Sequence, residues 1–277
     1  MTAAAGRLYV AQPALSKRLL ALERELGVAL FERMPRGVTL TEAGRELLDP
    51  AREAIAAWDS GVAGLQRLSQ VDELVIGLQT AVGRGLQRRA FARFRELVPG
   101  AVPSLRLVPW DDPTAGLADG SSDVAFIWLP GPVDGLDCLT VAVEPRFVAL
   151  PLGHPLTAMN RVPFSELPDE PFLALPATAG PLREFWLAND HRGGQAAVIG
   201  AVVLTADAAL EAVAAGLGLV LIAAGNVPLY ERPGVVTRPV DGLTEATLAL
   251  AWRADDRRMV VGAFVRAVEE SLGEHDS

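Results

Sequence analysis

Apolar positions near the start of the chain repeat at the spacing of a helix. Four leucines follow one another at intervals of four, three and four residues: Leu15, Leu19, Leu22 and Leu26. This spacing places them in one stripe along a helix that opens at Gln12, with Pro13 suited to its first turn. Lys17 and Arg18 fall outside the stripe, so the helix is predicted to bury an apolar face and to expose a basic one.

The segments on either side of this helix predict a winged helix-turn-helix. Residues 2–8 favour a short helix, and residues 9–11 are few enough to form a tight turn between the two helices. Further along, two short extended pieces, residues 30–31 and 38–40, surround a turn at residues 33–37. This turn with its flanking strands is the predicted wing.

A long helix is predicted from its N-cap at Thr41 to about residue 70, with a kink at Pro50. Its apolar positions alternate spacings of three and four, as in a coiled-coil seam: Leu48, Ala51, Ile55, Trp58, Val62 and Leu65. Such a seam favours a homodimer through this helix. A single helix packed on its own domain stays an alternative, because Gly61 and Gly64 each weaken the helix by about 1 kcal/mol.

Beyond Val71, short apolar strands alternate with helical segments. Strands are predicted at four places: residues 74–77, 105–109, 124–128 and 147–150. Residues 86–97 predict an amphipathic helix with Phe91 and Phe94 on its inner face. This alternation predicts parallel sheets with crossover helices, which is the α/β fold class.

Length and composition set the scale of the fold. The 277 residues suit a small domain and a larger one, and the apolar half of the chain can bury a core. No apolar run is long enough to span a membrane and the start lacks the pattern of a secretory signal, so we expect a cytoplasmic protein.

Cys138 is expected to be a small buried residue, and His154, before a proline in a turn, to be structural. One cysteine and three scattered histidines predict neither a disulfide nor a metal site.

The net charge of −9 is distributed unevenly along the chain. Residues 1–45 carry three more basic than acidic side chains, so the remaining residues carry a charge of −12. A basic head on an acidic body suits contact with phosphates at the head alone. Ordinary variation of surface charge is the alternative explanation.

The stretch VAQPALSKRLLALERELGVALFERMPRGVTLTEAG closely resembles the DNA-binding domain of LysR-type transcriptional regulators. The resemblance implies that the helix-turn-helix binds double-stranded promoter DNA. It implies DNA contacts from five residues of the recognition helix: Gln12, Pro13, Ser16, Lys17 and Arg18. It also implies a phosphate contact from Arg33 and wing contacts from Arg36 and Gly37. An amphipathic helix with a solvated basic face is the alternative for this segment.

The segment departs from the family pattern in two ways. Ala11 stands where the family usually has a serine that caps the recognition helix, so we expect that cap to be missing. Family members also have a first helix in front of Thr2. Without it, apolar side chains such as Leu8 and Leu15 would lack a packing partner, at a cost of several kcal/mol. We therefore expect a misplaced start codon or a truncated chain.

Two phrases of the body resemble the LysR effector-binding domain, which has two lobes like a periplasmic solute-binding protein: residues 150–156 (LPLGHPL) and residues 214–222 (AAGLGLVLI). The resemblance thus covers nearly the whole chain. It implies a winged helix-turn-helix at residues 1–42, a linker helix at residues 43–70 and an effector-binding domain at residues 72–270. Within the effector-binding domain, lobe one comprises residues 72–144 and 246–270, and lobe two comprises residues 145–245.

Ligands of open α/β sheets bind at the carboxyl ends of strands. By the resemblance, five residues line the effector cleft: Thr80, Ala81, Trp128, Thr178 and Thr205. For the three threonines, helix capping is an equal alternative, and the two roles are compatible. Trp110 and Trp128 stand at strand ends and either floor the cleft or pack in the core.

Together these features predict a LysR-type regulator whose promoter binding is modulated by a small-molecule effector of unknown identity, with carboxylates and aromatic metabolites as candidates. We expect a homodimer or a tetramer, no cofactor and no catalytic residues. The rivals are an enzyme and a plain cytoplasmic binding protein without DNA binding, since one α/β body hosts many functions. The sequence contains no glycine-rich phosphate loop, serine nucleophile elbow or Cys–His pair that would favour an enzyme.

Overall fold

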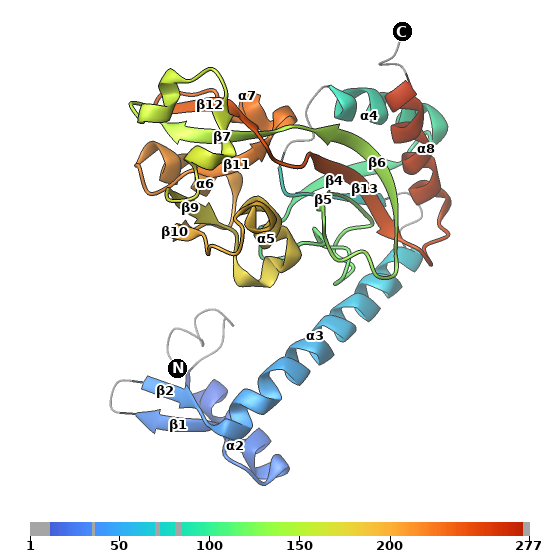
Figure 1. Cartoon of the computed structure of the whole chain (residues 1–277). Coiled ribbons are helices and arrows are strands. Elements are labelled where there is room, and N and C mark those ends of the chain that lie inside the picture. The colour runs from blue at the N-terminus through green and yellow to red at the C-terminus, as the bar shows by residue number, and fades with distance from the viewer. Residues whose placement is uncertain (1–11, 35–36, 70–72, 81–84, 274–277) are drawn as a thin grey trace. The chain divides into compact units, whose positions relative to one another are not determined.

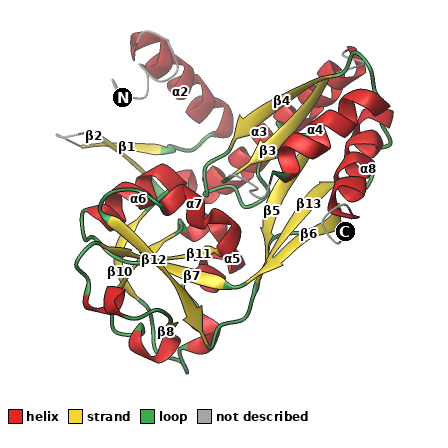
Figure 2. Ribbon diagram, turned by 90° about the horizontal axis from the view of Figure 1, so that it is seen from above, coloured by secondary structure: helices red, strands yellow, loops and turns green. Residues whose placement is uncertain are grey.

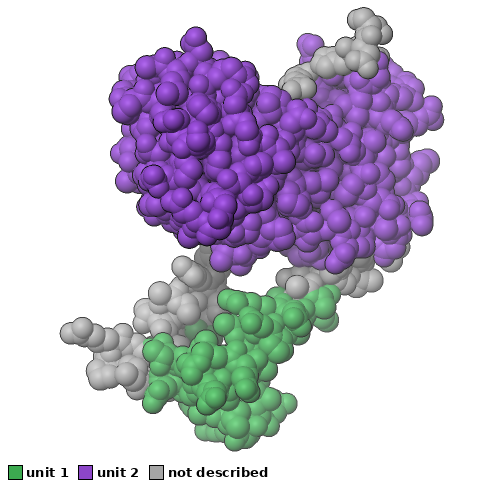
Figure 3. Space-filling view, in the orientation of Figure 1, with its two compact units in different colours: residues 1–62 green, residues 63–277 purple. Residues whose placement is uncertain are grey.

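The computed structural model describes residues 12–34, 37–69, 73–80 and 85–273. The chain divides into two compact units, which we call the N-terminal unit (residues 1–62) and the C-terminal unit (residues 63–277) (Figure 3). The helix predicted at residues 2–8 and the turn after it lie outside the described residues.

The N-terminal unit contains the predicted helix, the hairpin and the start of the long helix (Figure 1). Its elements are α2 (Gln12–Leu26), β1 (Phe31–Met34), β2 (Gly37–Leu40) and α3 (Glu42–Ser69), which continues into the second unit. The hairpin is antiparallel, with Phe31 opposite Leu40. These bounds confirm the predicted helix from Gln12 and a two-stranded hairpin. The first strand spans Phe31–Met34 rather than residues 30–31, so Arg33 and Gly37 lie in strands and not in the turn.

Specific hydrogen bonds hold α2, the hairpin and α3 together. The Glu23 carboxylate accepts the backbone N–H groups of Leu30 and Phe31 at 2.8 and 3.0 Å, which ties α2 to the start of β1. Thr41 caps α3 as predicted, because its Oγ1 accepts the Gly44 N–H at 3.0 Å. A Cβ at Gly44 would lie 2.1 Å from the carbonyl oxygen of Leu30, so the close approach of α3 to this loop requires glycine.

Lobe one of the C-terminal unit is built on a five-stranded sheet in the order β4-β3-β5-β13-β6. Its strands are β3 (Glu73–Leu78), β4 (Val102–Leu107), β5 (Val124–Leu129), β6 (Leu136–Glu144) and β13 (Ala246–Arg253). Two helices lie together on one side of this sheet (Figure 2): α4 (Leu86–Leu97) and α8 (Met259–Gly273). Phe94 of α4 is fully buried as predicted and meets the Phe264 ring edge-on at 5.4 Å, while Phe91 is only half-buried.

Lobe two contains a four-stranded sheet in the order β11-β7-β12-β8 and a parallel pair of strands, β10 and β9. The strands are β7 (Arg146–Pro151), β8 (Val162–Pro163), β9 (Pro171–Ala174), β10 (Val198–Val202), β11 (Val220–Ala223) and β12 (Val235–Asp241). The helices are α5 (Pro181–Trp186), α6 (Ala206–Ala214) and α7 (Val227–Tyr230), with 3₁₀ turns η1 (Pro155–Ala158), η2 (Phe164–Glu166), η3 (Ala177–Ala179), η4 (Asn189–His191) and η5 (Ala224–Asn226).

Three expectations from the sequence are corrected. The sheets are mixed rather than parallel: β13 runs antiparallel to β5 and β6, because the chain crosses to lobe two after β6 and returns through β13. The second strand spans Val102–Leu107 rather than residues 105–109, because all six of its residues pair with β3. Cys138 is exposed rather than buried, because it lies on β6, the edge strand of its sheet.

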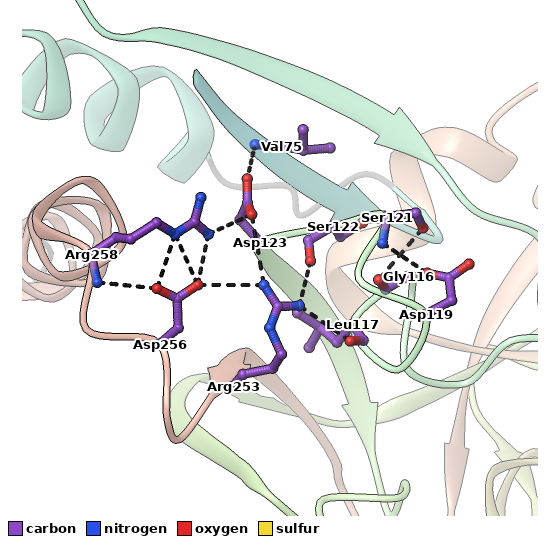
Figure 4. Close-up of polar contacts among 10 residues, drawn as sticks. All are labelled: Val75, Gly116, Leu117, Asp119, Ser121, Ser122, Asp123, Arg253, Asp256 and Arg258. Atoms are coloured by element: carbon purple, nitrogen blue, oxygen red, sulfur yellow. Dashed lines mark hydrogen bonds and ion pairs between the residues drawn. The ribbon is translucent and has the colours of Figure 1, made fainter. Parts of the chain in front are cut away.

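Two buried polar clusters fix the elements of the C-terminal unit. At the crossings between the lobes, the buried Arg146 guanidinium donates to the Thr244 carbonyl and Oγ1 at 2.8 and 2.9 Å and to the Phe185 carbonyl at 2.8 Å. Burial lowers the pKa of Arg146 to about 10. In lobe one, Asp123, Arg253, Asp256 and Arg258 connect the start of α8 to the sheet (Figure 4): the Asp123 carboxylate accepts the Val75 N–H at 2.8 Å and pairs with Arg258.

Candidate functional site

The first turns of α2 present the predicted DNA-contacting residues. Pro13, Lys17 and Arg18 are exposed and Ser16 is half-buried. Positions 13, 16 and 17 lie on one side of the helix, because residues three and four apart are neighbours on its surface. The basic pair is thus available to solvent at the N-terminal half of α2, where a recognition helix meets base edges and phosphates.

The predicted wing contacts are only partly described. Arg33 lies in β1 and Gly37 in β2, on either side of the hairpin turn, and Arg36 lies outside the described residues. The backbone of Gln12 begins α2, while the side chains of Gln12 and Arg33 are outside the described part of the chain. The hairpin therefore places Arg33 and Gly37 at the tip of the wing.

A narrow pocket lies between the two lobes of the C-terminal unit. The space between its lining atoms is about 410 Å³ with open solvent included, of which the centre of a water-sized sphere can occupy about 30 Å³. Lobe one lines it with four residues: Gln79, Thr80, Trp110 and Trp128. Lobe two lines it with eight: Leu175, Leu182, Trp186, Val220, Leu221, Ile222, Asn226 and Tyr230. The pocket adjoins the ends of β3 and β5 in lobe one, as expected for ligand sites of open α/β sheets.

Two contacts of pocket residues join the lobes across this space. The Asn226 Nδ2 donates to Thr80 Oγ1 at 3.4 Å, a long hydrogen bond. The rings of Trp128 and Trp186 meet edge-to-face, with centroids 5.6 Å apart and an interplanar angle of 85°. Both lobes therefore contribute to one wall, and a change in their separation would change the shape of the pocket.

The pocket wall is apolar, with a few buried polar groups. Gln79 is only 4% exposed; its Nε2 donates to the Asp112 carbonyl at 2.7 Å, and its Oε1 has no hydrogen-bond partner. Tyr230 is buried, and that burial raises the pKa of its phenol. Such a lining binds small molecules by burying apolar surface and orients them through a few hydrogen bonds.

The described residues show two absences. They contain no cluster of three or more His, Cys, Asp or Glu side chains placed to hold a metal ion. None of the described helices has both the length and the apolar character needed to cross a membrane.

Comparison with known proteins identifies the family. The LysR substrate binding domain matches residues 69–273, and the bacterial regulatory helix-turn-helix protein of the lysR family matches residues 1–45. The HTH-type transcriptional regulator TfdS of Cupriavidus pinatubonensis is 30% identical, over 98% of this chain and 93% of the relative. The chain belongs to the LysR family. The Hca operon transcriptional activator HcaR of Escherichia coli is 26% identical, over 98% and 92% of the two chains.

Solved LysR structures show the same architecture over the full length. Full-length CbnR complexed with its target DNA is 26% identical, with a TM-score of 0.56 over 98% of this chain and 93% of that one. Full-length BenM is 25% identical, with a TM-score of 0.57 over 99% and 92%. These likenesses confirm the predicted LysR-type regulator with a winged helix-turn-helix, a linker helix and a two-lobed effector domain, and they favour it over a binding protein or enzyme without DNA binding.

The LysR effector residues expected from the sequence separate into two groups. Thr80 and Trp128 line the pocket, and Ala81 lies outside the described residues. Thr205 caps α6 by accepting the Ala208 N–H at 3.2 Å, and Thr178 is exposed in η3. These last two do not line the pocket, and their contact with an effector stays a prediction.

Several pocket residues were not among the predicted site residues. Gln79 follows the last residue of β3 and precedes Thr80, and this position at a strand end is the signal that could have found it. Trp186, Asn226 and Tyr230 come from α5 and from the η5–α7 segment, elements of three to six residues that carry no periodic signal. Only folding brings them to the pocket, opposite lobe one.

Proposed function

We propose that this LysR protein binds promoter DNA through α2 and the wing as a homodimer, and that an effector in the interlobe pocket modulates the binding. The proposal assigns residues 1–42 to the DNA-binding domain, 43–70 to the linker helix and 72–270 to the effector domain. The exposed pair Lys17 and Arg18 at the N-terminal half of α2 is the observation that carries it. CbnR, a relative of the same architecture, has been solved on its target DNA.

The proposed DNA contacts rest on the exposure of Lys17 and Arg18 and, for the other residues, on the family resemblance. Residues at the start of α2 reach base edges and phosphates, with Lys17 and Arg18 neutralising phosphate charge. The wing adds a phosphate contact from Arg33 and further contacts from Arg36 and Gly37. In the recognition helix, Gln12, Pro13 and Ser16 complete the proposed set.

Dimerisation is assigned to α3. Leu48, Ile55 and Trp58 of this helix are 36%, 61% and 73% exposed, so the predicted seam is uncovered in the described part of the chain. Apolar positions on such a seam bury one another when two copies pair. Two recognition helices then face successive major grooves of a roughly palindromic site, and a pair of dimers gives a tetramer.

In this proposal, binding of the effector and binding of DNA are thermodynamically linked. A small carboxylate or aromatic metabolite that binds between the lobes changes their separation, and through the oligomer it changes the spacing of the recognition helices on DNA. The pocket is a binding site without catalytic residues, and the protein works as a regulator in the cytoplasm, where its DNA is.

DNA binding is tested by removing the basic pair. In the full chain, Lys17→Ala with Arg18→Ala should weaken binding to a fragment of its own upstream DNA by about tenfold or more, and lower the slope of log affinity against log salt by about two. The matched control is Arg88→Ala with Arg95→Ala, which removes the same charge from exposed positions on α4. Equal affinity of the two double variants, measured by fluorescence anisotropy, would contradict the proposal.

A further inference from the structure

Among the residues that the structure describes, the interlobe pocket is lined by several aromatic rings and by no charged side chain. Three tryptophans and a tyrosine contribute to its wall, and the rest are aliphatic or neutral polar side chains. None of the twelve lining residues is acidic or basic. A ligand that fills this space therefore exchanges water for aromatic faces and edges, which favours a flat apolar body.

Two arginines in contact with residues of this region donate hydrogen bonds to protein oxygens. Arg183, next to the lining residue Leu182, donates to the carbonyl of Leu175. Arg146 stacks over the Phe185 ring at 4.3 Å and donates three hydrogen bonds to the oxygens of Thr244 and Phe185. A ligand carboxylate in this pocket would lose its water without gaining a cation among the described lining residues, which is unfavourable.

One hydrogen-bond acceptor in the wall remains open. The amide of Gln79 has a fixed orientation, because its Nε2 must donate to the Asp112 carbonyl, which can only accept. Its Oε1 is therefore the free end, buried and without a partner. A buried acceptor that lacks a partner is unfavourable, and a ligand donor would remove this cost.

We propose that the pocket takes an uncharged aromatic molecule that carries a hydroxyl or N–H group and donates it to the Gln79 carbonyl. Trp110, Trp128 and Trp186 enclose the ring, and Gln79 sets its orientation from lobe one. The inference rests on the proposed function in taking this pocket as the effector site. It favours the aromatic class over the carboxylate class, because the described lining residues include no cation.

Three single-ring probes separate the features of the proposed ligand. Phenol has the ring and the donor, anisole keeps the ring without the donor, and benzoate replaces the donor with a negative charge. Isothermal titration calorimetry of the full chain near neutral pH, with tryptophan fluorescence as a second readout, should give the order phenol, anisole, benzoate. Anisole should bind about three- to tenfold more weakly than phenol, which is the worth of one hydrogen bond. Benzoate should bind at least about a hundredfold more weakly.

A variant of Gln79 assigns the donor contact. Gln79→Met should weaken phenol binding to the level of anisole and leave anisole binding unchanged. Gln195→Met makes the same change at an exposed glutamine paired with Asp169 and should alter neither affinity. The order of the three probes on the unmodified chain needs no variant, so the test stands even if Gln79→Met does not fold.

Three outcomes would overturn this inference: benzoate binding as tightly as phenol, anisole matching phenol, or no phenol binding up to its solubility limit. None of these outcomes bears on DNA binding through Lys17 and Arg18, because that binding is measured on ligand-free protein. The two proposals can therefore fail separately. Tight benzoate binding that Trp128→Ala abolishes would keep the pocket as the effector site while rejecting the uncharged ligand.

Discussion

The two units of this LysR protein differ in how much of their apolar side-chain surface they bury. In the described part of the N-terminal unit, Leu30 is the one large apolar side chain that is buried, whereas Leu22 and Leu26 of α2 are 40% and 45% exposed. The C-terminal unit packs most of its large apolar side chains into a core shared by both lobes. The C-terminal unit is therefore stabilised by its own core, while the N-terminal unit exposes apolar surface that suits contact with another protein chain.

Deleting a core ring of the C-terminal unit should have the largest effect. Phe94→Ala removes a fully buried ring that packs edge-on against Phe264, so the free energy of unfolding should fall by about 3–5 kcal/mol. Urea denaturation followed by circular dichroism measures this. Leu22→Ala, at an exposed apolar position of α2, is the matched control and should change that transition by less than about 0.5 kcal/mol. Equal losses would remove the contrast between the units.

The charged cluster at the start of α8 gives the C-terminal unit a dependence on pH. Burial alone would raise the pKa of Asp256, but hydrogen bonds and charge from Arg258, with the charge of Arg253, lower it below its ordinary value of 3.8. A carboxyl with a lowered folded-state pKa stabilises the fold above 3.8, and this contribution is lost as the pH falls through the folded-state pKa.

Asp256→Asn should therefore cost about 1–3 kcal/mol near neutral pH and less in acid. The stability of the variant should fall less steeply than that of the unmodified protein as the pH drops below 3.8. Urea titrations at several pH values measure both slopes. Asp49→Asn, in an exposed pair with Arg52 on α3, is the control and should leave the slope unchanged. Parallel slopes for Asp256→Asn and the unmodified chain would refute the assignment.

Equivalent caps in the two units test whether each unit unfolds alone. Thr41 caps α3 and Thr205 caps α6, each by accepting one backbone N–H, and the Thr41 hydroxyl also donates to the Ala29 carbonyl at 2.7 Å. Replacing either with alanine should cost about 1 kcal/mol. Thermal melts should show Thr41→Ala acting on the N-terminal unit and Thr205→Ala on the C-terminal unit, with hydrogen exchange locating each change. If both variants weaken the same segments, the units unfold together.

The sequence predicted those elements whose signal is local. The helix at residues 86–97 was predicted with its observed bounds, because its apolar spacing and its flanking segments agree. The cap at Thr41 and the hairpin around Gly37 were local signals of the same kind. The basic pair of α2 followed from a motif that is continuous in the chain.

Features that depend on distant pairing could not be predicted. Asp123 meets Arg258 across 135 positions, and no local pattern connects them. Cys138 was expected to be buried because small apolar residues usually are, yet only the strand order reveals that β6 is an edge. Thr80 and Trp128 were expected from the resemblance to the LysR family, whereas Trp186 and Tyr230 reach the pocket only through the crossing of the chain between the lobes.

The smallest effect on the C-terminal unit should come from the most exposed aromatic of α3. Trp58 is 73% exposed, so Trp58→Ala should change the unfolding of the C-terminal unit by less than about 0.5 kcal/mol. The same substitution should weaken the proposed dimer by about 2 kcal/mol, because a large aromatic on a helix seam is buried when two copies pair. Analytical ultracentrifugation over a dilution series measures the dimer, and Glu53→Ala, at an exposed charged position of α3, is the control. If Trp58→Ala leaves the dissociation constant of the dimer unchanged, the apolar surface of α3 serves another contact. The contrast in apolar burial between the units would then not explain how the protein assembles.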